Sequence, residues 1–178
     1  MESLNLLLWQ QFGAALDMLE NALTACPDTL WQNGSNFCYL GFHTLFWTDY
    51  YLSDETPMEK DFMPPAPFTK TDFEEDLMPE RIYEKKELLT YCQYVREKLR
   101  DQLTRCTPAE LSTKRFISEF KDYSLFEMLL YNMRHVQHHT AQLNLLLRQG
   151  THEAAPHWVS RTKRVLSNPE ISKSQDQK

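Results

Sequence analysis

Glycine is scarce in this sequence, with only four residues among 178. A chain poor in glycine and rich in Leu, Glu, Lys and Gln is typical of helical folds, because those side chains lose little rotamer freedom in a helix. The glycine-dependent motifs GxGxxG, the P-loop and GxSxG are absent, which argues against the common nucleotide-binding loops and the serine hydrolase elbow. These absences favour an all-α fold.

Cysteine pairs at metal-binding or redox spacing are missing as well. None of the four cysteines forms a CxxC pair with another, and they stand at Cys26, Cys38, Cys92 and Cys106. A chain of this length does not need disulfide bonds to fold. We therefore expect reduced and mostly buried thiols.

The chain also lacks a basic stripe and a long apolar run. Its net charge is −6, and its cations alternate with acids, as in Glu84-Lys85-Lys86-Glu87. Proteins that bind DNA through phosphates need clustered cations, so nucleic acid is not expected as a partner. No apolar run approaches the roughly 20 residues of a membrane span, and no signal peptide is recognisable. No membrane partner is therefore expected, and a cytoplasmic location follows by default.

Apolar residues recur at three- and four-residue steps along four stretches of the chain, which is the pattern of helices with one buried face. A shorter capped helix is expected at Thr107-Pro108-Ala109-Glu110, and no stretch shows credible strand alternation. We predict an antiparallel four-helix bundle in one domain over residues 1–165, followed by a polar, frayed tail over 166–178. The four long helices are expected at about residues 4–24, 36–52, 80–104 and 125–150.

Capping signals indicate where these helices begin and end. Ser35 or Asn36 is the expected N-cap of the second helix. Ser124 and Glu127 form a capping box at the start of the fourth, and Gly150 marks its end.

A long irregular segment over residues 53–78 separates the second and third helices. Its prolines break any long helix. Its apolar side chains, Phe62 and Phe68 among them, argue against disorder, so we expect it to pack on the bundle as a lid or specificity loop. Pro79 then stands at the first turn of the third helix.

Two histidines one helical turn apart give the first sign of chemistry. His135 and His139 lie about 40° apart around the axis of the fourth helix, so their imidazoles can converge on one ion. Such pairs bind zinc, nickel, copper or iron, although two histidines at this spacing can also be ordinary surface residues. His138 offers an alternative pair with His135, and the spacing alone does not decide between them.

His43 is the third candidate ligand and lies among aromatic residues in the second helix. A buried imidazole costs free energy unless it gains a partner, which is either a core hydrogen-bond acceptor or a metal ion. Both histidine-bearing helices have apolar faces suited to the bundle centre, where facing helices assemble metal sites. We therefore infer a metal site that joins His43 to the pair on the fourth helix.

The chain resembles the DinB-like (DinB/YfiT) family of metal-dependent proteins over roughly residues 5–160. The resemblance rests on Gly41-Phe42-His43-Thr44-Leu45-Phe46-Trp47 and on His135-x-x-x-His139-x-x-Gln142-Leu143. It implies an antiparallel four-helix bundle, often a homodimer, with one divalent metal ion (zinc or nickel) held by the three histidines His43, His135 and His139. The family's glutamine follows the second ligand of the pair by three residues, which selects His139 and leaves His138 as a flanking residue.

The same resemblance implies a function. Three protein ligands leave a fourth position open for water or a substrate thiolate. The family suggests a metal-dependent enzyme that uses a low-molecular-weight thiol on a small-molecule substrate in S-transferase-type chemistry, or a related metal-assisted hydrolysis. The alternative is a non-catalytic metal- or ligand-binding stress-response protein, in which a residue such as Glu127 closes the fourth position.

No catalytic residue is assigned from the sequence, but four residues are expected around the metal. Gln142 is one turn past His139 and is expected to fix a ligand tautomer or a bound water. Trp47 and Tyr50 share the helix face of His43, and Tyr131 lies one turn before His135, so all three are candidates to line the pocket, with core packing as the alternative.

Overall fold

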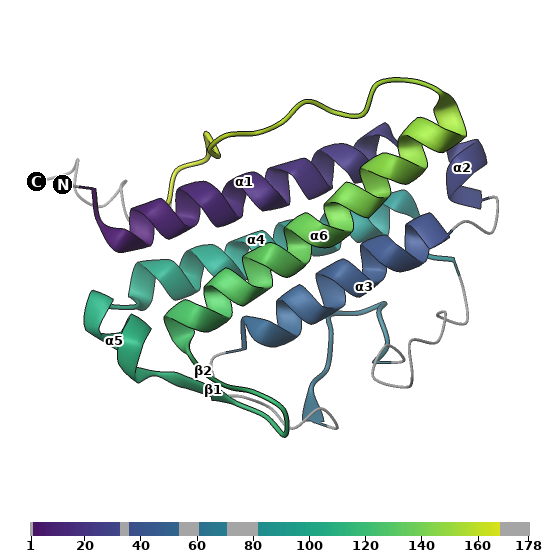
Figure 1. Cartoon of the computed structure of the whole chain (residues 1–178). Helices are drawn as coiled ribbons and strands as arrows, with labels where there is room; N and C mark the ends of the chain where they lie inside the picture. Colours follow the sequence, from purple (N-terminus) through teal and green to yellow (C-terminus); the bar gives the residue numbers. More distant parts are fainter. Residues whose placement is uncertain (1, 33–35, 54–60, 71–81, 168–178) are drawn as a thin grey trace, which may run out of the picture.

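Figure 1 shows a computed structural model of the chain, which describes residues 2–32, 36–53, 61–70 and 82–167. This part of the chain is mostly helical, which confirms the all-α class predicted from composition. Its long helices are α1 (Leu4–Ala25), α3 (Asn36–Tyr51), α4 (Lys85–Arg105) and α6 (Leu125–Thr151), and its short ones are α2 (Asp28–Gln32) and α5 (Pro108–Thr113). None of these helices is long and apolar enough to cross a membrane.

The four long helices lie side by side around a shared apolar core (Figure 1). Helix α1 packs against α4 and α6, and α3 packs against the same two helices. Helices α1 and α6 run in one direction and α3 and α4 in the other (Figure 1). The expected antiparallel order therefore describes the α1–α4 and α3–α6 pairs, whereas α1–α6 and α3–α4 are parallel. The long connection between α3 and α4 permits this, because it returns the chain to the end at which α3 began.

Residues 61–70 of that connection pack on the helices. Phe62 and Phe68 are 5% and 7% exposed. The ring of Phe62 lies 5.3 Å from that of Phe46 in α3, and the ring of Phe68 stacks on Tyr91 in α4 at 4.5 Å. The rest of the predicted lid, at 54–60 and 71–78, lies outside the described residues.

The start of α4 differs from the prediction. Residues 82–84 are not helical, and the helix begins at Lys85 rather than near residue 80. The backbone N–H of Glu84 donates to the Glu87 carboxylate at 2.8 Å, so this local capping bond sets the helix start. Pro79, the predicted first-turn residue, and Ser35, one predicted N-cap, both lie outside the described residues.

The end of α6 also differs from the prediction. The helix continues through Gly150 to Thr151, and His152 takes the left-handed cap with φ of 59°. Gly150 serves a close approach instead, because a Cβ there would lie 2.9 Å from Leu30 Cδ1 of α2. At the other end, the Ser124 hydroxyl accepts a bond from the Glu127 N–H at 3.2 Å, which is the serine half of the predicted capping box.

A short antiparallel hairpin precedes α6, so the expectation of no strands was wrong. Strands β1 (Arg115–Ile117) and β2 (Asp122–Ser124) pair with Phe116 opposite Tyr123. Three residues a strand are too few for alternation to stand out in the sequence. The Arg115 side chain donates to the Asp122 carboxylate at 3.0 and 2.6 Å across the pair. Because Ser124 ends β2 and caps α6, the hairpin is tied directly to the start of that helix.

The segment after α6 runs back along α1 (Figure 1). The Thr162 N–H donates to the Gln10 carbonyl at 3.0 Å, and the Trp9 indole donates to the Arg164 carbonyl at 2.6 Å. Gly13 allows this approach, since a Cβ there would lie 2.6 Å from Thr162 Cγ2. Of the tail predicted at 166–178, residues 168–178 lie outside the described residues.

A buried carboxylate links α3 to α4. Asp49 is 1% exposed, and its two oxygens accept bonds from the Tyr91 hydroxyl at 2.9 Å and the Lys98 ammonium at 2.5 Å. Burial raises the pKa of Asp49 above its usual value, and the nearby Lys98 charge only partly offsets this. The folded state therefore favours the protonated carboxyl relative to the unfolded chain.

Substituting Asp49→Asn is expected to lower the free energy of unfolding by less than about 1 kcal/mol at neutral pH, because the amide keeps an acceptor for Tyr91 and removes a buried charge. Asp49→Ala, which leaves the Tyr91 hydroxyl unpaired, is expected to cost about 2–3 kcal/mol. The pKa of Asp49 is higher in the folded protein than in the unfolded chain. Protonated Asp49 therefore adds to the free energy of unfolding of wild type at low pH, and this contribution is lost as the pH rises through the folded-state pKa. Urea unfolding at several pH values measures the free energy of unfolding of both proteins. If wild type became more stable relative to Asp49→Asn as the pH rises, the expectation would be contradicted.

Candidate metal centre

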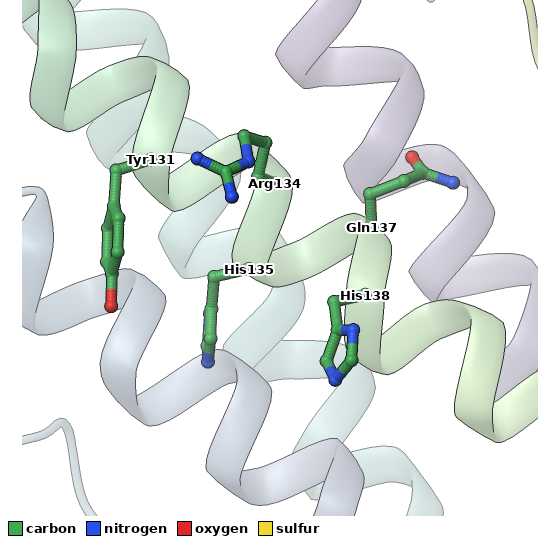
Figure 2. Close-up of a pocket in the computed structure, with 5 residues that line it drawn as sticks. All are labelled: Tyr131, Arg134, His135, Gln137 and His138. Carbon is green, nitrogen blue, oxygen red and sulfur yellow. The ribbon is translucent and has the colours of Figure 1, made fainter.

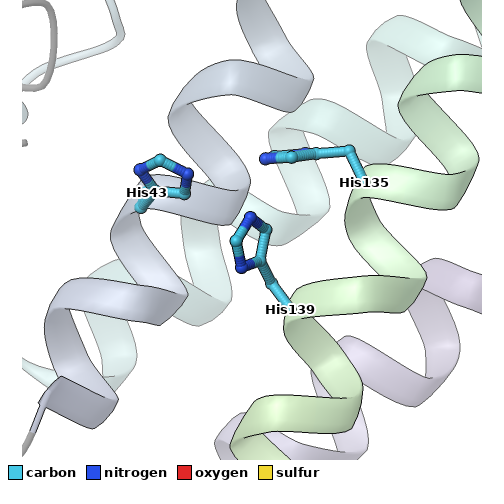
Figure 3. A group of neighbouring side chains, drawn as sticks. All are labelled: His43, His135 and His139. Carbon is cyan, nitrogen blue, oxygen red and sulfur yellow. The ribbon is translucent and has the colours of Figure 1, made fainter.

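Three histidines converge where α3 meets α6. His135 and His139 lie one turn apart on α6, and His43 lies in the middle of α3. Figure 3 shows their imidazoles turned toward one another across the two helices. All three side chains are half-buried, and one nitrogen from each lies within 4.8 Å of the others. The cluster could therefore hold a metal ion, and it has the composition predicted from the sequence.

The rings of the cluster approach at different angles. The centroids of His135 and His139 are 4.6 Å apart, and those of His43 and His139 are 4.8 Å apart, both nearly edge to face. The His43 and His135 centroids are 5.6 Å apart. Each ring thus points a nitrogen into the common space instead of stacking on its neighbours.

The charge state of His135 suits a metal ligand. Burial, and then the neighbouring His139 and His43, lower the pKa of His135 to about 2. Its imidazole is therefore neutral at physiological pH and keeps a lone pair for coordination. Its Nδ1 is buried and has no hydrogen-bond partner within the described ranges, which costs about 1–3 kcal/mol unless a ligand satisfies it. Three imidazole nitrogens are a donor set suited to zinc, nickel, copper or iron.

Gln142 fixes the orientation of one of these rings. Its Oε1 accepts a hydrogen bond from His139 Nδ1 at 2.7 Å. With the proton held on Nδ1, Nε2 carries the free lone pair. Bonds of this kind set the tautomer of metal-ligating histidines in proteins.

His138, the alternative ligand, is not part of the convergent group. It is exposed, although its ring centroid lies 5.0 Å from that of His139. It lines an open pocket of about 450 Å³ on the outer side of α6 (Figure 2). The other residues of this pocket are Tyr131, Arg134, His135 and Gln137. His138 therefore belongs to the approach to His135 and not to the convergent group.

The three aromatic candidates lie in different surroundings. Tyr131 lines the pocket beside His135 (Figure 2). The Trp47 ring lies 6.4 Å from that of His43. Tyr50 is 2% exposed and packs edge to face on Phe62 and Phe116 at 5.3 and 5.7 Å, so it has the surroundings of a core residue.

Two residues near the site were not found from the sequence. The Tyr51 ring lies 6.2 Å from that of His135 and 5.3 Å from that of Tyr131. The Lys121 ammonium lies 5.4 Å from the centroids of both tyrosine rings. Helical spacing from His43 favoured Tyr50 over its neighbour Tyr51, and Lys121 comes from the hairpin that the sequence did not predict.

No fourth protein ligand completes the cluster in the part of the chain that the structure describes. Among the described His, Cys, Asp and Glu residues, only these three histidines form a group that could hold a metal ion. Glu127, which the sequence suggested as a possible fourth ligand, is exposed at the first turn of α6. The four cysteines are all buried, and none of them forms a disulfide bond within the described residues. Burial raises the pKa of Cys26 to about 11 and that of Cys92 to about 12, so neither thiol ionises near neutral pH.

The comparisons with known proteins agree with this arrangement. The family model of the DinB superfamily matches residues 11–143, a range that contains all three histidines and Gln142. No curated protein matches the chain, and no solved structure matches it.

Proposed function

The chain belongs to the DinB superfamily, and from this membership together with the convergence of three imidazoles we propose that it is a metal-dependent enzyme built on a four-helix bundle. His43, His135 and His139 hold one divalent ion. The reaction is an S-transferase-type transfer in which a low-molecular-weight thiol attacks an electrophilic small molecule.

The observation that carries this proposal is the donor set. Among the described residues, the group holds three histidine nitrogens and no carboxylate or thiol. Such a donor set matches catalytic sites, which keep a position for water or substrate, better than closed structural sites. A divalent ion bound there would act as a Lewis acid and lower the pKa of a thiol or water in that position. Because Cys26 and Cys92 have raised pKa values and all four cysteines are buried, the chain offers no obvious nucleophilic thiol of its own. The thiol is therefore supplied as a substrate.

The chain's own residues orient the site in this scheme. Gln142 holds the proton of His139 on Nδ1 and so keeps the other nitrogen available. Tyr131 borders His135 on the outer side of the cluster, and Trp47 lies near His43. In the reaction, the thiol loses its S–H proton to solvent or to the leaving group. A bond then forms from sulfur to the electrophilic carbon, and the leaving group departs with its electron pair.

The test begins with protein purified without chelators. About one divalent ion per chain is expected by elemental analysis. Protein reloaded with Co²⁺ is expected to develop sulfur-to-cobalt charge-transfer absorption when 2-mercaptoethanol is added, and a panel of thiols with electrophiles is expected to show turnover that a chelator abolishes. Absence of bound metal would overturn the site. Metal binding without any spectral response or turnover with thiols would overturn the thiol chemistry and favour a non-catalytic binding protein.

A further inference from the structure

The turn of the hairpin fixes the position of Lys121. The Ser118 N–H donates to the Lys121 carbonyl at 2.7 Å, which closes the turn between β1 and β2. From there the half-buried Lys121 side chain places its ammonium 5.4 Å from the ring centroids of Tyr51 in α3 and Tyr131 in α6. Two helices and the hairpin therefore position one cation.

That cation stands beside the metal centre. Tyr131 lies one turn before His135 on α6, and the Tyr51 ring meets the His135 ring edge to face at 6.2 Å. The two rings that hold the ammonium are thus the rings that border His135.

No described carboxylate neutralises this cation. The Asp122 carboxylate, the nearest acid along the chain, is bound by Arg115 across the hairpin. Within the described ranges, Lys121 makes no ion pair with an acidic side chain.

This placement points to the chemistry of the substrate. A divalent ion on uncharged ligands and an unpaired ammonium beside it form a strongly positive site in a chain of net charge −6. Such a site favours a ligand with two negative groups, one on the metal and one on the cation.

We propose that Lys121 is a specificity-determining residue that binds the carboxylate of an acidic thiol whose sulfur occupies the three-histidine centre. The proposal deepens the function proposed above and rests on it. The contacts to Tyr51 and Tyr131 orient the Lys121 ammonium. Its N–H groups then donate hydrogen bonds to the carboxylate, so the positive charge of Lys121 determines the preference.

The test compares two thiols of the same length on Co²⁺-loaded protein, 3-mercaptopropionate and neutral 3-mercaptopropanol, by their charge-transfer absorption. Wild type is expected to bind the acidic thiol about ten-fold more tightly, the effect of one hydrogen bond to a charged group. Lys121→Met is expected to remove this preference while leaving affinity for the neutral thiol unchanged. Lys121→Arg is expected to retain it, and Lys86→Met, which removes an exposed lysine from α4, serves as the matched control.

The outcomes separate this inference from the function on which it rests. A preference for the acidic thiol that persists in Lys121→Met would overturn the role of Lys121 and leave the thiol chemistry standing. If neither thiol gives a signal, the thiol chemistry fails, and Lys121 is then tested with malonate, an acid without sulfur, by calorimetry. Equal malonate affinity in wild type and Lys121→Met would overturn the role of Lys121. Thermal unfolding of each variant confirms that it is folded, and Lys121→Gln replaces the Met variant if that variant is not.

Discussion

Replacing His135 with alanine is expected to weaken the binding of a divalent ion by at least about 100-fold, because one of three ligands is lost and ligand nitrogens contribute several kcal/mol each. His138→Ala is the matched control on the same helix. It removes an imidazole of identical chemistry from an exposed position outside the cluster, and it is expected to change affinity by no more than about two-fold.

Competition with a chromophoric chelator measures both affinities. Gln142→Ala is expected to fall between the two variants, at about ten-fold, because the bond to His139 Nδ1 orients a ligand without supplying one. Added metal is expected to raise the melting temperature of wild type and of His138→Ala but not of His135→Ala, since a ligand stabilises only the state that binds it. Equal losses in the His135 and His138 variants would make His138 a ligand and reject the arrangement described above.

A second large effect is expected at Arg96, whose guanidinium is fully buried between α1 and α4. It lies 2.8 Å from an oxygen of Asp17 and 2.7 Å from an oxygen of Glu20. Arg96→Ala is expected to lower the free energy of unfolding by about 3 kcal/mol, because it leaves two acids without their buried cation and opens a cavity. Arg96→Met, which fills the volume, separates these two contributions.

Arg164 provides an internal control, because it contacts the same two acids from the C-terminal segment. Its guanidinium lies 3.4 Å from Asp17 and 2.9 Å from Glu20, but its side chain is 41% exposed. Arg164→Ala is expected to cost no more than about 1 kcal/mol, as is usual for ion pairs in contact with water. Urea unfolding measures both variants, and equal losses would show that burial does not set the strength of these pairs.

The features that the sequence predicted well are those with a local cause. Helix α1 follows from the three- and four-residue repeat of its apolar residues. The cap of α5 follows from Thr107 and Glu110, which lie in the same short segment. The spacing of His135 and His139 fixes their convergence because both lie on one rigid helix. For His43, the sequence offered only a buried imidazole in need of a partner, and the choice of partner depended on how α3 packs on α6.

The features that it did not predict depend on contacts between distant segments. The hairpin strands are too short to show alternation, so Lys121 had no predicted place near Tyr51 and Tyr131. Gly150 was taken for a helix end because glycine often terminates helices. Its actual role, a close approach of Leu30, becomes visible only once α2 is placed against α6.

The burial of all four cysteines has a consequence for the proposed reaction, in which one substrate is an electrophile. Alkylating agents react with thiolates, and a thiol that is both covered and protonated reacts slowly. The raised pKa values of Cys26 and Cys92 would therefore shield the polypeptide from the electrophiles of the proposed reaction. For the same reason, a thiol-reactive dye added to the folded protein would report on a small-molecule thiol in the site, with little background from the chain.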